Sequence, residues 1–283
     1  MKKENGLFII IVILLFLILG MSYVYGKYYF PSAKSYSSYL EIFQEFESSE
    51  INTISIDSIN HNVVIKPSNN EKIKVSYYQK VDNSNVFKLE QKCLNMVFIE
   101  RVENFDSLIF QPERNVGVIT VYLPQDITID IVVKTVIGSF SMSDVTARNI
   151  SFNNITGDFV MNNVNCNRIS LTCNTGNVNF KDVVFNNFNG SVVSGIFEFA
   201  LVDSADLYKF NVSTTYGQLK LNNGYIYVTN VVNEIETVEK SNSLISAGSK
   251  DGKIFVFDTL RGNIYITSVE EKEIVEENTE VVE

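Results

Sequence analysis

The sequence predicts an all-β protein: a single-stranded β-solenoid, similar to a parallel β-helix with about 19–22 residues per rung, behind an N-terminal transmembrane helix. Three observations carry this prediction: a strand-rich composition, a repeat that begins with glycine, and an apolar run near the N-terminus. The 283 residues are 45% hydrophobic and 12% aromatic, with 14 Gly and only 4 Pro. Abundant Val, Ile, Phe, Tyr and Asn suit strands joined by turns, which disfavours helical classes.

Glycines begin a repeated unit in the second half of the chain. Four of them are 19 residues apart and a fifth follows after 22 residues: Gly138, Gly157, Gly176, Gly195 and Gly217. Apolar residues stand two and four positions after each glycine, and this alternation is typical of a strand with one buried face. Gly252 and Gly262 begin the same pattern at less even spacing, with the pairs Ile254 and Val256, and Ile264 and Ile266.

A unit of about 20 residues cannot bury its apolar side alone, so like units must stack and share one core. Stacking predicts two interior columns. The first contains Phe140, Phe159, Val178, Phe197 and Leu219, and the second contains Met142, Met161, Phe180, Phe199 and Leu221. We expect these side chains to fill the core rather than to bind a ligand. The glycines then mark a corner that needs a positive φ or close backbone packing.

Two further apolar positions recur in each unit and predict its second strand. Seven residues after the glycine stand Val145, Val164, Val183 and Val202, and twelve residues after it stand Ile150, Ile169, Phe188 and Leu207. We therefore expect solenoid repeats over residues 135–268. Residues 51–134 contain β-like segments outside the 19-residue spacing, and we expect them to cap the first rung.

The N-terminus predicts membrane attachment. No residue from Leu7 to Tyr25 is charged, and these 19 residues (7–25) fall within the range of about 17–25 that crosses a bilayer as a helix. Lys2 and Lys3 favour a cytoplasmic position for residues 1–6, so the remainder is expected outside the cytoplasm, at the cell membrane. A cleaved signal peptide is the alternative, because the strongest apolar core spans only 13 residues. Both interpretations make the folded domain extracytoplasmic.

Two segments flank the predicted domain. Residues 26–50 are interpreted as a juxtamembrane stalk. In it Tyr36, Tyr39, Leu40, Phe43 and Phe46 fall at helical spacing, which favours a short helix, or else a stalk with scattered aromatic side chains. Residues 269–283 are predicted to form an acidic flexible tail, since 270–283 contain seven Glu and one Lys.

Net charge limits the classes of partner. The chain carries a formal charge of −10 and has no basic stripe, which disfavours binding to nucleic acid or directly to anionic lipid.

Candidate catalytic groups are few. His61 is the only histidine, and its neighbours Asn60 and Asn62 favour a turn. Asp144 and Asp182 occupy equivalent turn positions with Asn163 in the rung between them, so a carbohydrate-cleaving site is an alternative to a solvated turn. We expect no catalytic residue, no cofactor and no metal site.

The three cysteines match no zinc motif. Cys93, Cys166 and Cys173 are interpreted as small buried hydrophobic residues, with a Cys166–Cys173 bridge or an intermolecular thiol as the alternatives.

The short strands, the Val-Tyr-Leu-Pro strand end at residues 121–124 and the glycine-started units resemble a bacterial family of adhesin domains of unknown function. Members are often carried behind one transmembrane helix, and the resemblance covers residues 51–268. It implies a membrane-anchored solenoid of the cell envelope, with a link to envelope stress systems. It supplies no catalytic residues.

Three classes of function are compatible with these observations. The sequence favours a non-catalytic surface module that binds an envelope polymer, another protein or another copy of itself through its flat sheet faces. A sensory or regulatory ectodomain is the second class, and it needs a membrane partner because only six residues precede the predicted helix. A carbohydrate-active β-helix enzyme is the third, and the absence of Trp weighs against it.

Overall fold

The computed structural model describes residues 39–80, 87–100, 117–125, 127–222, 224–225, 227–232, 235–241, 243–245 and 252–268, and these residues fold into β-strands with two short 3₁₀ turns. The all-β prediction is confirmed. Among the described residues no helix is both long and apolar enough to cross a membrane. The predicted cytoplasmic N-terminus, transmembrane helix and acidic tail lie outside the described residues.

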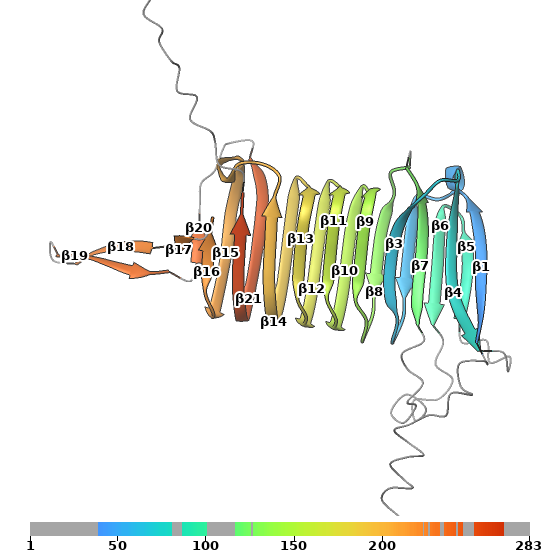
Figure 1. The fold of residues 1–283 in the computed structure, drawn as a ribbon, viewed down its shortest axis with the longest axis horizontal. Coiled ribbons are helices and arrows are strands. Elements are labelled where there is room, and N and C mark those ends of the chain that lie inside the picture. The colour runs from blue at the N-terminus through green and yellow to red at the C-terminus, as the bar shows by residue number, and fades with distance from the viewer. Residues whose placement is uncertain are drawn as a thin grey trace, which may run out of the picture.

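The strands form two walls of one elongated stack (Figure 1). The first wall contains, from the N-terminal end of the stack, β5 (Phe87–Lys92), β6 (Asn95–Glu100), β2 (Thr53–Asp57), β8 (Asp130–Lys134), β10 (Asn149–Thr156), β12 (Arg168–Thr175), the first parts of β14 (Asn187–Leu201) and β21 (Lys253–Thr267), β15 (Tyr208–Tyr216) and β20 (Ser243–Ile245). All neighbours in it are parallel except at its two ends, where β5 and β20 pair antiparallel.

The second wall has the same plan. It contains β1 (Tyr39–Glu47), β4 (Lys72–Lys80), β7 (Val118–Pro124), β3 (Asn62–Ser68), β9 (Phe140–Thr146), β11 (Phe159–Asn165), β13 (Val178–Val184), the second parts of β14 and β21, β16 (Leu219–Leu221) and β17 (Gly224–Tyr225). Two 3₁₀ turns, η2 (Ser48–Glu50) and η3 (Ala205–Leu207), connect strands. Strands β18 (Tyr227–Val232) and β19 (Ile235–Lys240) form a separate antiparallel hairpin that projects from the C-terminal end of the stack (Figure 1).

Successive central rungs are parallel and keep the 19-residue register. Asn149 pairs with Arg168, and Arg168 pairs with Asn187. In the second wall Phe140 pairs with Phe159, which pairs with Val178. Each rung is thus one strand of the first wall, a corner, and one strand of the second wall.

The order of the rungs in space differs from their order in the sequence. Strand β21 lies between β14 and the pair β15/β16, so Ile264 separates Phe197 from Leu219. Ile266 likewise separates Phe199 from Leu221. The prediction that Leu219 and Leu221 directly continue the two interior columns is wrong, because the chain passes to the last rung and then returns to fill the gap before it.

The N-terminal end shows the same return. Strands β2 and β3 lie between the rung of β6 and β7 and the rung of β8 and β9. The predicted cap of residues 51–134 therefore contributes rungs to the stack as well as an end. The antiparallel strands β1, β4 and β5 close that end.

The unit that begins at Gly252 does not follow the predicted pattern. In β21, Phe255 and Phe257 are buried, whereas Ile254 is 41% exposed. The prediction from Gly252 placed Ile254 and Val256 in the core, and the buried residues instead stand one position later. The reason is that Phe255 pairs with Phe188 and Phe210 of the neighbouring rungs. Gly262 fits the pattern, and Ile264 and Ile266 are buried.

Val202 and Leu207 also depart from the predicted pattern. Both are exposed, and the interior positions are taken by Leu201 and Phe210. A register shift between β13 and β14 pairs Val183 with Leu201. Leu207 belongs to the η3 turn, so the next strand starts later and Phe210 stands level with Phe188, on the other side of Phe255.

Residues 39–47 are a strand rather than the helix or stalk that the sequence suggested. Strand β1 pairs antiparallel with β4 along its whole length, from Tyr39 with Lys80 to Glu47 with Lys72. Phe46 is buried and Ile42 packs on the core, whereas Phe43 is 52% exposed. The backbone partner β4 thus decides the conformation of a segment whose apolar residues are compatible with both periodicities.

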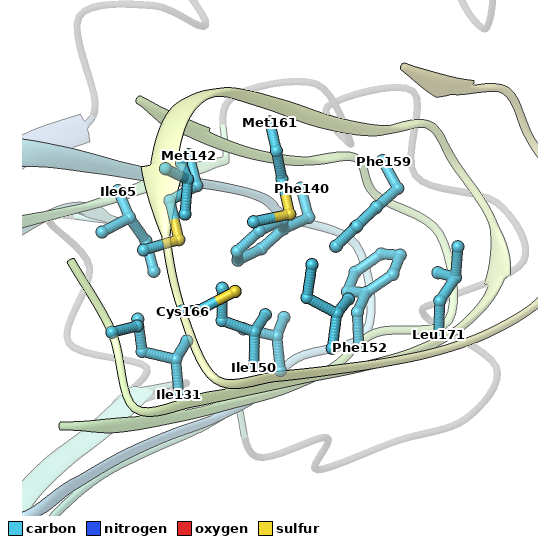
Figure 2. Close-up of a cluster of buried hydrophobic side chains, with 14 of the residues drawn as sticks. Ile65, Ile131, Phe140, Met142, Ile150, Phe152, Phe159, Met161, Cys166 and Leu171 are labelled. Carbon is cyan, nitrogen blue, oxygen red and sulfur yellow. The ribbon is translucent and has the colours of Figure 1, made fainter. Parts of the chain in front are cut away.

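The core lies between the two walls along the whole stack. In Figure 2, Met142 and Met161, and Phe140 and Phe159, project inward from the second wall toward Ile150, Phe152 and Leu171 of the first. The rings of Phe140 and Phe159 stack with centroids 5.1 Å apart. Nearer the C-terminal end, a cluster of phenylalanines around Phe188 fills the space between the walls.

Candidate functional site

The most regular feature of the molecule is the corner at which each rung passes from the first wall to the second. We call it the glycine corner; it is formed by Gly138, Gly157, Gly176, Gly195, Gly262 and Gly217, in spatial order. A Cβ atom placed on Gly176 would lie 2.0 Å from the carbonyl oxygen of Gly157, and one on Gly195 would lie 1.9 Å from that of Gly176. Stacking at this spacing therefore leaves no room for a side chain at these two glycines.

A positive φ adds to this requirement at two of the corner residues. Gly157 has a φ of 150° and Gly262 a φ of 154°. Gly252 does not lie in the glycine corner. It directly precedes strand β21, and the corner residue of that strand is Gly262.

Small polar side chains stand three residues before the corner glycines and face the interior. They are Thr135, Asn154, Cys173, Thr259 and Thr214, with Val192 as the apolar exception. Asn154 Nδ2 donates to the Gly138 carbonyl oxygen at 2.7 Å, and Thr214 Oγ1 donates to that of Gly262 at 2.9 Å. These groups satisfy buried carbonyl oxygens at the turn, which would otherwise be costly to leave without a hydrogen bond.

A series of hydrogen bonds between successive rungs is formed by the residues that directly follow the corner glycines. The amide of Asp158 donates to Ser139 Oγ at 3.0 Å, and the amide of Asn177 donates to Asp158 Oδ1 at 2.8 Å. The amide of Ile196 in turn donates to Asn177 Oδ1 at 2.9 Å. Each rung is thereby tied to the next by a side chain as well as by the backbone, which gives the corner a structural role.

His61 occupies the glycine corner of an outer rung. Its carbonyl oxygen lies 2.0 Å from a Cβ placed on Gly138, and its imidazole covers Gly117 of the adjoining rung. The neighbouring Asn62 accepts a hydrogen bond from the Ser139 amide at 2.8 Å. His61 is therefore part of the corner column.

The two aspartates that suggested a hydrolytic site lie at the opposite corner. Asp144, Asn163 and Asp182 have φ values of 57°, 51° and 54°, in the left-handed region that Asp and Asn tolerate best after Gly. Asn163 Nδ2 donates to Asp144 Oδ1 at 2.8 Å. Together with Gln125 they line a shallow surface hollow of about 260 Å³. A tight turn accounts for these residue types at this position.

The two candidate carboxylates of this hollow lie on rungs that are not neighbours. A general acid–base pair needs two titratable groups that converge on one reacting atom, and here an amide side chain stands between the two carboxylates. Among the described residues, no three His, Cys, Asp or Glu side chains gather where they could hold a metal ion.

The cysteines are unpaired. Cys166 is buried two residues before β12 and Cys173 is buried near the end of that strand, which keeps them too far apart to form a disulfide. The prediction that Cys93 is buried is wrong, because this residue is exposed at the tight turn between β5 and β6. Burial raises the pKa of the Cys166 thiol to about 12, and it also raises the pKa of Cys173. Both thiols are therefore protonated and inert at neutral pH.

Sequence reasoning found the corner glycines and the interior columns but missed the buried polar groups beside them. The missed signal is a small polar residue three positions before most corner glycines, as in Asn154 before Gly157 and Thr214 before Gly217. The sequence also did not show that His61 occupies a corner position, because the rung of β2 and β3 lies outside the 19-residue spacing.

The fold and these corners define a class: two-walled parallel β-solenoids whose rungs are tied together at a glycine corner. A family model described as Toastrack DUF4097 matches residues 51–277, and the chain belongs to this family. No curated protein matches the sequence.

Several solved bacterial structures are similar to the chain. A putative cell adhesion protein from Clostridium sporogenes has 14% identity and a TM-score of 0.45, over 82% of this chain and 100% of its own. A putative adhesin from Bacteroides fragilis has 11% identity and a TM-score of 0.44, over 81% and 97%. A putative lipid binding protein from Parabacteroides distasonis has 10% identity and a TM-score of 0.32, also over 81% and 97%.

Proposed function

We propose that this chain is a non-catalytic binding module of the bacterial cell envelope, anchored in the membrane by residues 7–25 and displayed outside the cytoplasm. One observation carries the binding role: two extended walls hold regular rows of outward side chains on a single apolar core. Repeat scaffolds of this kind suit the binding of extended partners. The uncharged run from Leu7 to Tyr25 supports the anchor.

The anchor and the orientation are tested together by fractionation and protease treatment of intact cells. We expect the full chain in the membrane fraction, resistant to alkaline carbonate, with the folded domain degraded by external protease. The matched control is the double variant Leu14→Arg/Leu15→Arg, which places two charges at the centre of the span, where each costs about 2.5–3.5 kcal/mol. Recovery of the wild-type chain in the soluble cytoplasmic fraction would contradict the proposal.

The absence of catalysis is tested by incubating the purified full chain with soluble and insoluble envelope glycans. We expect no release of reducing ends. Turnover that is lost in Asp144→Asn/Asp182→Asn would show that the hollow at the second corner is an active site. A matched substitution in the same column, Asn163→Asp, controls for general damage to the turn.

Partner capture in intact cells separates a binding module from a sensor. A membrane-impermeant cross-linker is expected to join the displayed domain to envelope polymer or to another extracytoplasmic chain. If capture yields only an integral membrane protein, the sensory ectodomain is the better description.

A further inference from the structure

The outward side of the first wall carries an uncharged surface at the middle of the stack. We call it the neutral face; its residues alternate with the buried ones in β10, β12 and the first part of β14, and they are Ser151, Asn153, Ile155, Ser170, Thr172, Asn174, Asn189, Ser191 and Val193. Arg168 stands at its margin. In a chain with a net charge of −10, this face combines small polar and aliphatic side chains only.

An exposed aliphatic row runs along one border of the neutral face, two residues before the corner glycines. Val136, Ile155, Val193 and Leu260 are 40%, 50%, 44% and 44% exposed, respectively. They lie on successive rungs in register, with Asn174 as the one polar member of the row. A row of exposed aliphatic side chains over several rungs is a feature of surfaces that bind a partner.

We propose that the neutral face is the contact between two copies of this chain, packed wall against wall about a twofold axis. If two copies bind each other, their charge favours contact through this uncharged face rather than through the charged surfaces. Two chains of net charge −10 repel each other, and the centre of a protein interface is depleted of charged residues.

The other described surfaces of the stack do carry charge. On the second wall, Lys181, Glu198 and Lys220 point outward. The outermost strand β1 carries Glu41, Glu45 and Glu47, and the outermost strand β5 carries Lys88, Glu90 and Lys92. Charged edge strands discourage pairing end to end. Apart from Asp144 at the corner, the outward positions of β9 and β11 in the second wall are also uncharged, and Lys134 of β8 and Asp258 of β21 flank the neutral face. The aliphatic row is the feature that favours the neutral face as the surface where copies meet.

The size and chemistry of the face fit a protein partner of the same shape. Three rungs at about 4.8 Å, with about eight residues at 3.3 Å each, give roughly 400 Å² per partner. Standard interfaces bury about 800 Å² per partner, so we expect a weak and reversible dimer. The outward positions of β10, β12 and the first part of β14 hold no aromatic side chain, which disfavours a sugar polymer as the occupant.

This inference deepens the proposed function, because it names one partner of the displayed domain. It rests on that proposal only for the local concentration: confinement of anchored copies to a membrane would raise the population of a weak dimer. The contact itself needs no anchor and can be measured in detergent solution.

The test is site-directed cross-linking of the purified full chain in detergent, in a Cys93→Ser background that removes the exposed thiol. Ser170→Cys places a thiol at the centre of the neutral face, and Asn162→Cys places one on the outward side of β11 in the second wall. With a short bismaleimide, we expect about tenfold more dimer from Ser170→Cys than from Asn162→Cys, since tenfold corresponds to a modest difference in contact free energy.

A charge variant provides the second readout. Thr172→Glu brings two like charges together in the dimer, so the dissociation constant from sedimentation should rise about tenfold or more. Asn162→Glu adds the same charge to the second wall and should leave the dissociation constant unchanged.

Three outcomes would overturn the proposal. They are equal cross-linking from the two cysteine positions, an undisturbed dimer in Thr172→Glu, and a chain that stays monomeric at every concentration. A monomer that binds insoluble envelope glycan, and loses that binding in Thr172→Glu, would assign the face to a polymer instead. A wild-type chain recovered outside the membrane fraction would contradict the proposed anchor but would not change the cross-linking and sedimentation results. The two proposals can therefore be contradicted independently.

Discussion

Residue types at the glycine corner follow from the distance between rungs. Adjacent strands lie about 4.8 Å apart, and at this corner the carbonyl oxygen of one rung lies where the Cβ of the next would be. Glycine is therefore required by close approach, while a positive φ adds to the requirement only at Gly157 and Gly262. Asp and Asn at the opposite corner reflect a different cause, which is the left-handed conformation of Asp144, Asn163 and Asp182.

The substitution Gly176→Ala tests the close approach. Its Cβ would lie 2.0 Å from the Gly157 carbonyl oxygen, and the backbone cannot yield without separating two rungs. We expect the free energy of unfolding to fall by about 1–3 kcal/mol, the range typical of overpacking. Urea denaturation of Gly176→Ala and of the exposed control Asn174→Ala measures the difference. An equal, small effect in the two variants would contradict this account of the corner.

The ion pair of Asp130 and Arg148 gives the fold a pH dependence at residue scale. Arg148 Nε and Nη2 donate to the two Asp130 carboxylate oxygens, each at 2.9 Å, and this pairing lowers the pKa of Asp130. A lowered pKa in the folded state stabilises the protein above the unfolded value of about 3.9, and the stabilisation is lost as the pH falls through the folded pKa.

The variant Arg148→Gln should raise the pKa of Asp130 toward its ordinary value. Carboxyl chemical shifts followed by NMR through an acid titration measure this directly. The stability difference from wild type should be present at pH 7 and absent below the folded pKa. Arg168→Gln removes the same charge from the next rung and serves as the control; an Asp130 titration that is the same in Arg148→Gln and wild type would rule out the pairing.

At the scale of elements, strand β21 is the decisive feature of the C-terminal half. It pairs with β14 on one side and with β15 and β16 on the other, although 51 residues separate the end of β14 from its first residue (202–252). Lys253 pairs with Asp203, and the Tyr208 hydroxyl donates to the same carboxylate at 3.2 Å. These contacts fix the start of the returning strand against the loop that follows β14.

The substitution Phe255→Ala tests the register of this strand. Phe255 lies 4.9 Å from Phe188, 5.0 Å from Phe199 and 5.4 Å from Phe210, measured between ring centroids. We expect a loss of about 3–5 kcal/mol in the free energy of unfolding, as for other buried phenylalanines. The adjacent Ile254→Ala is the control and should cost less than about 0.5 kcal/mol. Thermal and urea unfolding would contradict the observed register if Ile254→Ala were the more damaging change.

Strand β1 shows why the spacing of apolar residues alone could not distinguish a helix from a strand. Leu40, Ile42 and Phe46 alternate as a strand requires, while Tyr39, Phe43 and Phe46 also recur at helical intervals. The available edge of β4 decides between them, since pairing satisfies the backbone of both strands. Phe43 is left outside, where the Lys74 ammonium lies 4.1 Å from its ring centroid.

At the scale of the whole molecule, the stack is a one-dimensional array in which each rung contacts its two neighbours. Its ends are closed by antiparallel strands, β1, β4 and β5 at one end and β17 and β20 at the other. Closing the ends in this way covers backbone groups that would otherwise template further pairing.

An added rung tests the repeat directly. Inserting a second copy of residues 149–167 after Asn167 adds one complete unit in register, and we expect a folded chain that is longer by about 4.8 Å. Small-angle scattering measures the length, and urea denaturation reports whether unfolding stays cooperative. A copy that lacks Gly157 is one residue shorter and turns half of its apolar side chains outward. If the 18-residue insertion were tolerated equally well, register would not be what holds the stack together.

The amino-acid pattern alone predicts that the chain is all-β, that its units stack in parallel, and that side chains such as Phe140, Phe159 and Met161 form the shared core. These properties are local, because the two-residue alternation and the 19-residue spacing are properties of consecutive residues. The order of the rungs, the place of His61 in the glycine corner and the strand conformation of residues 39–47 depend on contacts made in the folded chain. Any rung with the same apolar pattern can stack on any other, so the sequence pattern is degenerate in rung order. The returning strand β21 and the closed ends remove that degeneracy through contacts between residues far apart in the chain.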